Sequence, residues 1–247
     1  MISPLLLLLG MFSCVTAENA RKSDTRTDLG TAYLKEGNTP GAVEALRQAS
    51  ALNPQNATAW ERLGLAYMAS DAPKQAEDAF ERAIRVGTAL EPARVHYNYG
   101  LLLVRLERHE DALAQFEITL SDLTYRTPAK ALNSKGYTLY TMGRYDEAIE
   151  VLGKAIHRAP KLCQARFHRG LSYQAQGHHS TALDDFESVI QSCGDEATGA
   201  YYHAAMSLFP LGETDAGCIY LRTARRASAS DDFTKKILQT LQSECGA

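Results

Sequence analysis

Hydrophobic and small residues recur along the chain in units of 34 to 36 positions. In each unit a small residue is followed twelve positions later by an alanine, and four positions after that by a large apolar residue. The six sets are Gly30, Gly64, Gly100, Gly136, Gly170 and Ala204; Ala42, Ala76, Ala112, Ala148, Ala182 and Ala216; and Leu46, Phe80, Phe116, Leu152, Phe186 and Tyr220. Small residues on two antiparallel helices let the helices approach, and a large residue one turn later fills the groove beside them. The pattern therefore predicts a series of helical hairpins.

Turn and breaker residues fall between these marks, as hairpins require. Glycine-containing turns separate the two helices of a unit, for example at Lys35–Asn38, Met142–Arg144 and Gln176–His178. Prolines stand between units, where one helix has ended and the next begins; they are Pro54, Pro92, Pro128 and Pro160. The two longer units keep the internal spacing of twelve, so their extra residues belong to the connectors before Pro92 and Pro128.

This pattern resembles the tetratricopeptide repeat (TPR). The second unit carries the residues typical of the family, namely Trp60, Leu63, Gly64, Tyr67, Ala76, Phe80 and Ala83. The resemblance implies an all-α fold, a right-handed TPR superhelix (α-solenoid) of six helix-turn-helix repeats over residues 23–230. The expected repeat starts lie near residues 23, 57, 93, 129, 163 and 197. Residues 231–247 are expected to form a capping helix that covers the last apolar face.

Function in such an array depends on its surface, and helical spacing assigns the faces. Positions five, nine and twelve of the first helix in each repeat are expected to face the inner curve of the superhelix. The apolar residues at these positions are Leu34, Leu65, Met68, Tyr97, Leu101, Val104, Tyr137, Tyr140, Phe167, Leu171, Tyr201 and Leu208. One interpretation of the aliphatic members is that they are simply core. The tyrosines favour a groove, because a phenol needs a solvated or paired hydroxyl. An apolar groove of this kind favours an amphipathic or aromatic protein segment as ligand.

The sequence contains no pattern that predicts catalysis. It has no HExxH, GxSxG, P-loop, GxGxxG or CxxC motif. His178-His179 has no supporting cysteine or carboxylate cluster for a metal, and Asp184-Asp185 and Asp231-Asp232 diverge on a helix. A net charge of −3 without a basic stripe argues against nucleic acid. We therefore expect a non-enzymatic protein with no metal, cofactor, nucleic-acid partner or small-molecule substrate.

Four cysteines follow Cys14 in the chain. Cys163 opens the first helix of the fifth repeat and Cys193 ends its second helix, so these two ends are neighbours in an antiparallel hairpin. Cys218, in the last repeat, is within reach of Cys245 on the end helix. We predict disulfides Cys163–Cys193 and Cys218–Cys245; the alternative is four buried free thiols.

The leader at the N-terminus offers two processing sites. An apolar run from Pro4 to Val15 has the length of a signal peptide and is too short to span a bilayer. Met11-Phe12-Ser13-Cys14 is similar to a lipobox, which predicts a signal peptide over residues 1–14, a lipid on Cys14 and a tether over residues 15–22. The competing site is Val15-Thr16-Ala17, with cleavage before Glu18.

An exported TPR array with a cysteine at the end of its leader resembles the pilotin lipoproteins of type IV pilus systems. The resemblance implies a protein anchored by Cys14 at the periplasmic face of the bacterial outer membrane. It also implies that the protein assists assembly of the pilus secretin, and so pilus biogenesis and twitching or gliding motility. Two alternatives stay open: a soluble periplasmic TPR scaffold for cell-envelope machinery, and an accessory co-chaperone subunit.

Overall fold

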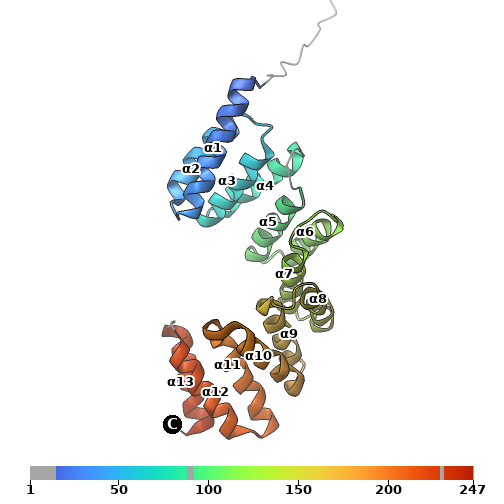
Figure 1. The fold of residues 1–247 in the computed structure, drawn as a ribbon, viewed down its shortest axis with the longest axis vertical. Coiled ribbons are helices and arrows are strands. Elements are labelled where there is room, and N and C mark those ends of the chain that lie inside the picture. The colour runs from blue at the N-terminus through green and yellow to red at the C-terminus, as the bar shows by residue number, and fades with distance from the viewer. Residues whose placement is uncertain (1–14, 88–91, 229–230, 247) are drawn as a thin grey trace, which may run out of the picture. The chain divides into compact units, whose positions relative to one another are not determined.

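The computed structural model describes residues 15–87, 92–228 and 231–246 and is all-helical in these ranges (Figure 1). The chain forms two compact units, one up to Asn98 and one from Tyr99 onward. The first unit contains α1 (Ala17–Lys35), α2 (Thr39–Leu52), α3 (Ala57–Ala69), α4 (Pro73–Val86) and the start of α5 (Pro92–Arg105). The second unit contains the rest of α5, α6 (His109–Ser121), α7 (Pro128–Thr141), α8 (Tyr145–Arg158), α9 (Cys163–Ala175), α10 (His179–Cys193), α11 (Thr198–Leu208), α12 (Thr214–Ala227) and α13 (Asp231–Cys245). Short 3₁₀ turns, η1 (Gly194–Ala197) and η2 (Phe209–Leu211), flank α11.

The predicted pairing of small and large residues holds the hairpins together. A methyl group built on Gly64 of α3 would lie 2.7 Å from the ring of Phe80 on α4. The same substitution at Gly170 of α9 would bring the methyl to 2.8 Å from the ring of Phe186 on α10. Both phenylalanines are fully buried. The glycines are therefore required by close approach, and the prediction of six helix-turn-helix repeats is confirmed.

The turn inside each hairpin places one residue in the left-handed region of backbone space. Gly143 and Gly177 have φ values of 75° and 78° there, which glycine adopts without steric cost. Asp71 and Glu107 take the corresponding places in the second and third repeats, with φ values of 54° and 59°. The turn geometry is thus kept even where the glycine is not.

The first helix begins earlier than the sequence pattern indicates. α1 starts at Ala17, and the Thr16 side chain caps it by accepting a hydrogen bond from the Asn19 backbone N–H at 3.2 Å. Lys22 pairs with Glu18 one turn before it, at 2.6 Å. The predicted tether over residues 15–22 is therefore wrong from Ala17 onward, because a side-chain cap and an i,i+4 ion pair favour helix in this segment. Cys14 and the rest of the leader lie outside the described residues.

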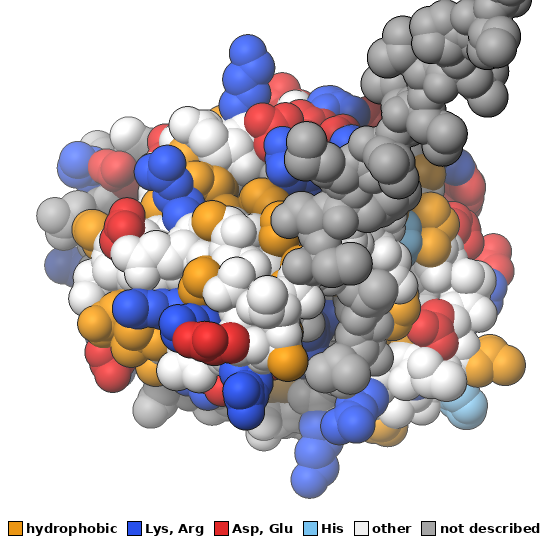
Figure 2. Space-filling view, turned by 90° about the horizontal axis from the view of Figure 1, so that it is seen from above, with side chains coloured by type: hydrophobic (Ala, Val, Ile, Leu, Met, Phe, Trp, Pro, Cys, Tyr) orange, Lys and Arg blue, Asp and Glu red, His pale blue; other side chains and the backbone are white. Residues whose placement is uncertain are grey.

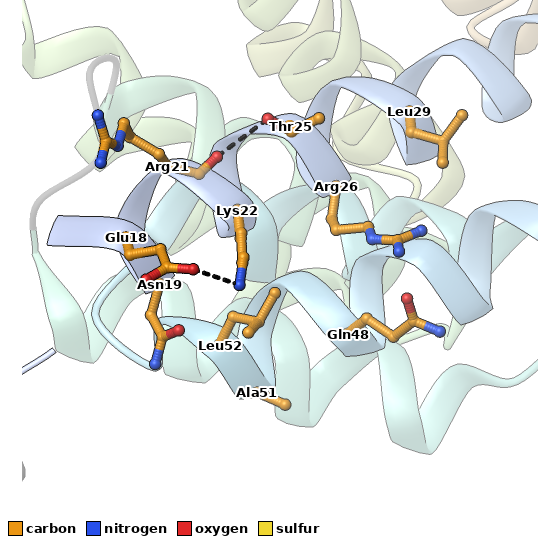
Figure 3. A pocket seen from close by; sticks show the side chains of 10 residues that line it. All are labelled: Glu18, Asn19, Arg21, Lys22, Thr25, Arg26, Leu29, Gln48, Ala51 and Leu52. Atoms are coloured by element: carbon orange, nitrogen blue, oxygen red, sulfur yellow. Dashed lines mark hydrogen bonds and ion pairs between the residues drawn. The ribbon is translucent and has the colours of Figure 1, made fainter. Parts of the chain in front are cut away.

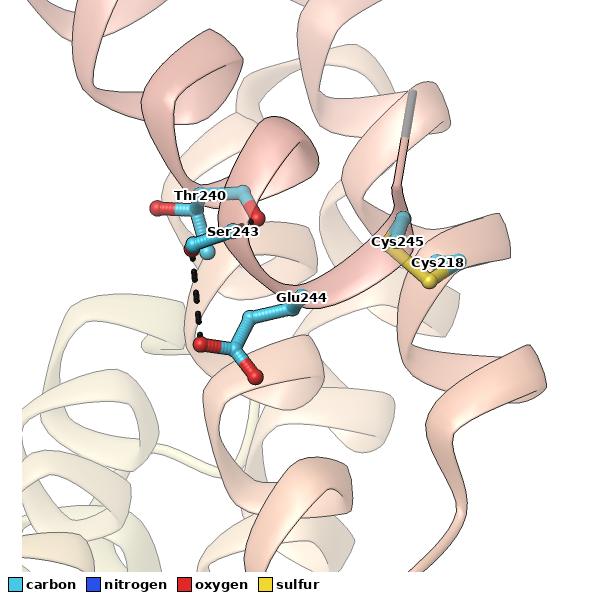
Figure 4. The surroundings of a disulfide bond; sticks show 5 residues. All are labelled: Cys218, Thr240, Ser243, Glu244 and Cys245. Atoms are coloured by element: carbon cyan, nitrogen blue, oxygen red, sulfur yellow. Dashed lines mark hydrogen bonds between the residues drawn. A yellow bond between two sulfur atoms is a disulfide. The ribbon is translucent and has the colours of Figure 1, made fainter.

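The last hairpin is covered by α13, as predicted for a capping helix. The Phe233 and Tyr202 rings meet edge to face at 5.4 Å between centroids, and Ile237 and Leu241 of α13 are buried in the same apolar cluster. A disulfide joins Cys218 of α12 to Cys245 at the end of α13, with Cα atoms 5.9 Å apart (Figure 4). The other predicted disulfide, Cys163–Cys193, joins the start of α9 to the end of α10, with Cα atoms 6.6 Å apart.

Within the described residues, every helix is too short or too polar to cross a membrane.

Candidate protein-binding face

In the second unit, an aromatic group forms around the predicted groove residues of α7. Tyr137 is 38% exposed, and its ring lies 6.3 Å from that of Tyr140 and 4.6 Å from the imidazole of His168 on α9. Tyr145, the first residue of α8, lies 5.8 Å from Tyr140. We call Tyr137, Tyr140, Tyr145 and His168 the tyrosine cluster. It presents apolar ring faces together with phenol hydroxyls, which suits contact with a protein segment.

Neutral hydrogen-bonded pairs link neighbouring repeats beside these rings. Asn133 Oδ1 accepts a hydrogen bond from Nδ1 of His168 at 2.9 Å. One repeat further, Gln174 Oε1 accepts from Nδ1 of His203 at 2.8 Å. The Gln174 amide also donates to the Ser207 hydroxyl at 2.8 Å. These bonds satisfy the side-chain oxygens of Asn133 and Gln174 and the Nδ1 atoms of the two histidines inside the protein.

Burial keeps the two histidines uncharged at neutral pH. It lowers the pKa of His168 from 6.5 to about 4. Burial also lowers the pKa of His203 to about 4, with a smaller contribution from the charge of Lys236. The pKa of the Tyr140 phenol is raised, mainly by burial. The imidazoles of His168 and His203 and the phenol of Tyr140 therefore carry no charge at pH 7.

Three other predicted groove residues of this unit pack partly against a core. Phe167 lies 5.7 Å from the buried ring of Phe186 and 5.6 Å from His203. Leu171 packs against the same apolar cluster, and Tyr201 contacts Tyr220 of α12 at 5.9 Å. These residues are half-buried. These residues help to hold the candidate face in place and add little exposed surface to it.

Leu208 is not a groove residue, and its prediction is wrong. The side chain is only 2% exposed. It is the last residue of α11, where the chain turns directly into η2 and Phe209 lies close against Gly217 of α12. A position that faces outward in a longer helix is enclosed here because the helix ends.

In the first unit, the predicted residues Leu65, Met68 and Tyr97 are all half-buried. A charged group lies among them. Glu61 is fully buried, and its carboxylate accepts two hydrogen bonds from Arg94, each 2.8 Å long, and one of 2.8 Å from the Asn98 amide. Leu101 and Val104, on the part of α5 in the second unit, are half-buried, as is Leu34 of α1.

These polar residues were missed because only apolar residues were considered at the inner positions. Glu61 and Asn133 both stand at the fifth position of their repeats, and their partners Asn98 and His168 both stand at the sixth position of the next. A polar residue at position five followed 35 to 37 residues later by another is the signal that could have revealed them. Such residues fix the register between repeats and define the chemistry of the face.

The described residues show no arrangement that suits catalysis. The buried carboxylates Glu61 and Asp185 are both held by arginines, the second by Arg169 at 2.7 and 2.8 Å. In the described part of the chain, no three His, Cys, Asp or Glu side chains gather in a way that could hold a metal ion. What the geometry offers is an uncharged aromatic face for binding.

Sequence models described as tetratricopeptide repeat match residues 27–85, 69–123, 129–162 and 164–195. Together these segments span most of the six hairpins, and the chain belongs to the tetratricopeptide-repeat family. This family is consistent with a non-enzymatic, protein-interaction role.

A particular relative is the type IV pilus assembly protein PilF of Pseudomonas aeruginosa. The two sequences are 29% identical over 161 residues, which covers 61% of this chain and 63% of PilF. The aligned region therefore spans less than two thirds of the relative.

Solved structures share the fold. A structure of PilF from Pseudomonas aeruginosa superposes with a TM-score of 0.76 at 19% identity, covering 90% of this chain and 99% of that one. PilW, a widely conserved type IV pilus biogenesis factor, gives a TM-score of 0.79 at 22% identity, covering 87% and 98%. MamA gives 0.60 at 22% identity, covering 72% and 94%. At these identities the likeness shows the fold alone, which proteins with different tasks share.

Proposed function

We propose that this chain is a lipid-anchored pilotin that assists assembly of the outer-membrane secretin of the type IV pilus. The observation that carries the proposal is the 29% identity to a type IV pilus assembly protein over 161 residues. A TPR array without a catalytic arrangement among its described residues fits an assembly factor that acts by binding. The coarser statement, a TPR protein in type IV pilus biogenesis, rests on the same similarity.

The start of α1 supports processing at Cys14. Cleavage before Cys14 leaves Thr16 in place, and with it the side-chain cap of α1. Cleavage after Ala17, the route to a soluble scaffold, removes that cap and cuts into the first turn of the helix. Loss of a threonine cap costs about 1 kcal/mol of helix stability. Several acyl chains on Cys14 would then hold the array at the membrane.

The partner segment would bind through apolar anchors on the tyrosine cluster. The rings of the cluster carry no formal charge at His168, whose burial lowers its pKa to about 4, so apolar contact is the chemistry that the cluster offers. A few residues contribute most of the binding energy in protein complexes, and tyrosine is enriched among them. A secretin segment with an aromatic or aliphatic side chain on one face is the expected ligand.

The first test is genetic. A strain lacking this protein should lose heat-resistant secretin multimers on gels and lose surface pili, and the full gene should restore both. Cys14→Ala should release the protein from the membrane fraction. If secretin multimers form normally in the deletion strain, the proposal fails.

Tyr137→Ala should weaken binding of the chain to the solubilised secretin by about fivefold or more, since truncating an aromatic anchor costs at least about 1 kcal/mol. Tyr125→Ala, in the connector between α6 and α7, is the matched control, because it removes a half-buried tyrosine outside the cluster. Surface plasmon resonance on the two variants measures the difference. Equal affinities would exclude the cluster as the binding site.

Mass spectrometry of the mature N-terminus separates the two processing routes. A lipidated Cys14 supports the anchored protein, and a chain that begins at Glu18 supports the soluble scaffold.

A further inference from the structure

An open pocket of about 900 Å³ lies on the first hairpin, and all the residues that line it come from α1 and α2 (Figure 3). Lys22 and Arg26 extend from α1 toward the part of α2 that carries Gln48, Ala51 and Leu52. Arg21 stands at its edge. The lining therefore holds three cations and one carboxylate, that of Glu18, together with the polar Gln48 and the apolar Ala51 and Leu52.

Two of these cations have no internal partner. Lys22 pairs with Glu18 at 2.6 Å, whereas the side chains of Arg21 and Arg26 make no hydrogen bond or ion pair with another described residue. All three basic residues are exposed. Unpaired guanidinium groups on a face of this kind are available to an anionic partner.

Asp24 and Asp28 of α1 are not among the residues that line the pocket, whereas Glu18 is. Asp24 accepts a hydrogen bond from the Asn56 amide at 3.1 Å, on the side toward α3. Asp28 follows Asp24 by four positions and so lies on the same side of the helix. The positive face is local, because the chain as a whole carries a net charge of −3.

An apolar surface accompanies the cations. Leu29 is 36% exposed and lines the same pocket, as does Leu52 of α2. In the space-filling view from above, hydrophobic side chains on the visible face are interspersed with Lys, Arg, Asp and Glu (Figure 2). Cations beside exposed leucine are the composition by which helices lie on a membrane surface.

The place of this face in the chain brings it close to Cys14. Only Val15 and Thr16 separate Cys14 from α1. Three residue steps reach at most about 10 Å. Arg26 stands nine positions into the helix, about 14 Å along its axis. A chain anchored at Cys14 therefore lets these cations reach the bilayer when α1 lies along its surface. There a headgroup layer attracts each Lys or Arg, and the attraction fades over a Debye length of about 10 Å.

We propose that the face formed by Arg21, Lys22, Arg26 and Leu29 is a second membrane contact, which binds the anionic headgroups of the bilayer that holds Cys14. This inference rests on the proposed anchoring at Cys14. With its first repeat bound to the membrane, the array can point in fewer directions than it could on a free tether. An anionic lipid surface is favoured over an acidic protein because these cations lie within twelve positions of the proposed anchoring residue.

The test uses a chain that begins at Val15, which retains every described helix and carries no lipid. Its folding is checked by circular dichroism. We expect it to co-sediment with vesicles containing phosphatidylglycerol at low salt, to be released by added salt, and to ignore vesicles of phosphatidylcholine alone. Lys22→Gln with Arg26→Gln should lower the affinity about tenfold or more, since each cation near an anionic surface contributes about a fivefold factor.

The matched control is Lys74→Gln with Arg85→Gln, which removes two exposed cations from α4 of the same unit. It should bind like the parent chain. Absence of binding to anionic vesicles, or equal losses in the two double variants, would overturn the proposal. In cells, a photocrosslinking amino acid at Leu29 should give a lipid adduct; a protein adduct alone would also overturn it.

This test is independent of lipidation. If Cys14 proves unmodified while the Val15 chain still binds anionic vesicles through Lys22 and Arg26, the anchoring proposal fails and the surface contact stands. If Cys14 is lipidated and the vesicles do not bind, the reverse holds.

Discussion

The two units place different polar residues at the fifth position of a repeat, where the side chain links that repeat to the next. In the first unit the fifth position holds Glu61, a fully buried carboxylate bound by Arg94 and Asn98. In the second unit the fifth position of the fourth repeat holds Asn133, which accepts a hydrogen bond from the neutral His168. One repeat-to-repeat link is ionic and the other is uncharged.

This difference shows that the repeat geometry specifies a polar link at this place but not its charge. A buried ion pair depends on both partners, because a carboxylate without its partner would keep an uncompensated charge in the interior. A neutral pair costs less to break, and it leaves the neighbouring aromatic face free of charge. The tyrosine cluster lies beside the neutral link, where uncharged binding chemistry is expected.

The ionic link should be the more sensitive of the two. Arg94→Met leaves Glu61 buried without its main partner, and we expect it to lower the free energy of unfolding by about 3–5 kcal/mol. Trp60, the single tryptophan of the chain, lies in the first unit, so its fluorescence during urea unfolding measures this loss.

The double variant Glu61→Leu with Arg94→Met is the control for this prediction. Because it removes both charges, it should be considerably more stable than Arg94→Met alone. A double variant as unstable as the single one would show that packing, and not the unpaired carboxylate, causes the loss.

The disulfides should stabilise only the second unit. Cys163→Ser with Cys193→Ser opens a link across 30 residues and should cost about 3 kcal/mol, since the closed loop restricts the unfolded chain. The first unit has no cysteine after Cys14. Loss of helicity measured by circular dichroism should therefore shift to lower urea, while the Trp60 transition stays in place. A parent chain whose unfolding does not respond to a reducing agent would contradict both disulfides.

The smallest effect expected is a dependence of the second unit on pH. His168 and His203 have pKa values of about 4 in the folded chain, against 6.5 when unfolded, so the unfolded state binds more protons between these values. Stability is therefore fully present above pH 6.5 and is lost as pH falls toward 4. Between pH 7 and pH 6 we expect a loss of about 1 kcal/mol from the two histidines together.

Urea unfolding followed by circular dichroism at several pH values measures this slope. His168→Gln keeps a donor for Asn133 and removes one of the two titrating groups, so it should reduce the slope by about half. If the dependence of stability on pH is unchanged in this variant, groups other than His168 cause it.

Much of the fold was predictable because its contacts are local in sequence. Gly64 meets Phe80, and Gly170 meets Phe186, at a separation of sixteen residues that the turn length sets. The same regularity placed Cys163 at the start of α9 and Cys193 at the end of α10. The candidate face was predicted only in part: Tyr137 and Tyr140 lie in the tyrosine cluster, but Tyr145 and His168 were not foreseen, and Leu208 was placed wrongly.

By itself, the sequence determined the six hairpins, their turns and the family, because a spacing of twelve and sixteen residues permits one way of packing two helices. Only the tertiary structure decided which polar residues meet across repeats and which apolar residues are enclosed. Asn133 and His168 are 35 residues apart, and their contact depends on the register of two helices that the chain links through a third. The same holds for the basic face of α1, which becomes a single surface only once α2 packs against it.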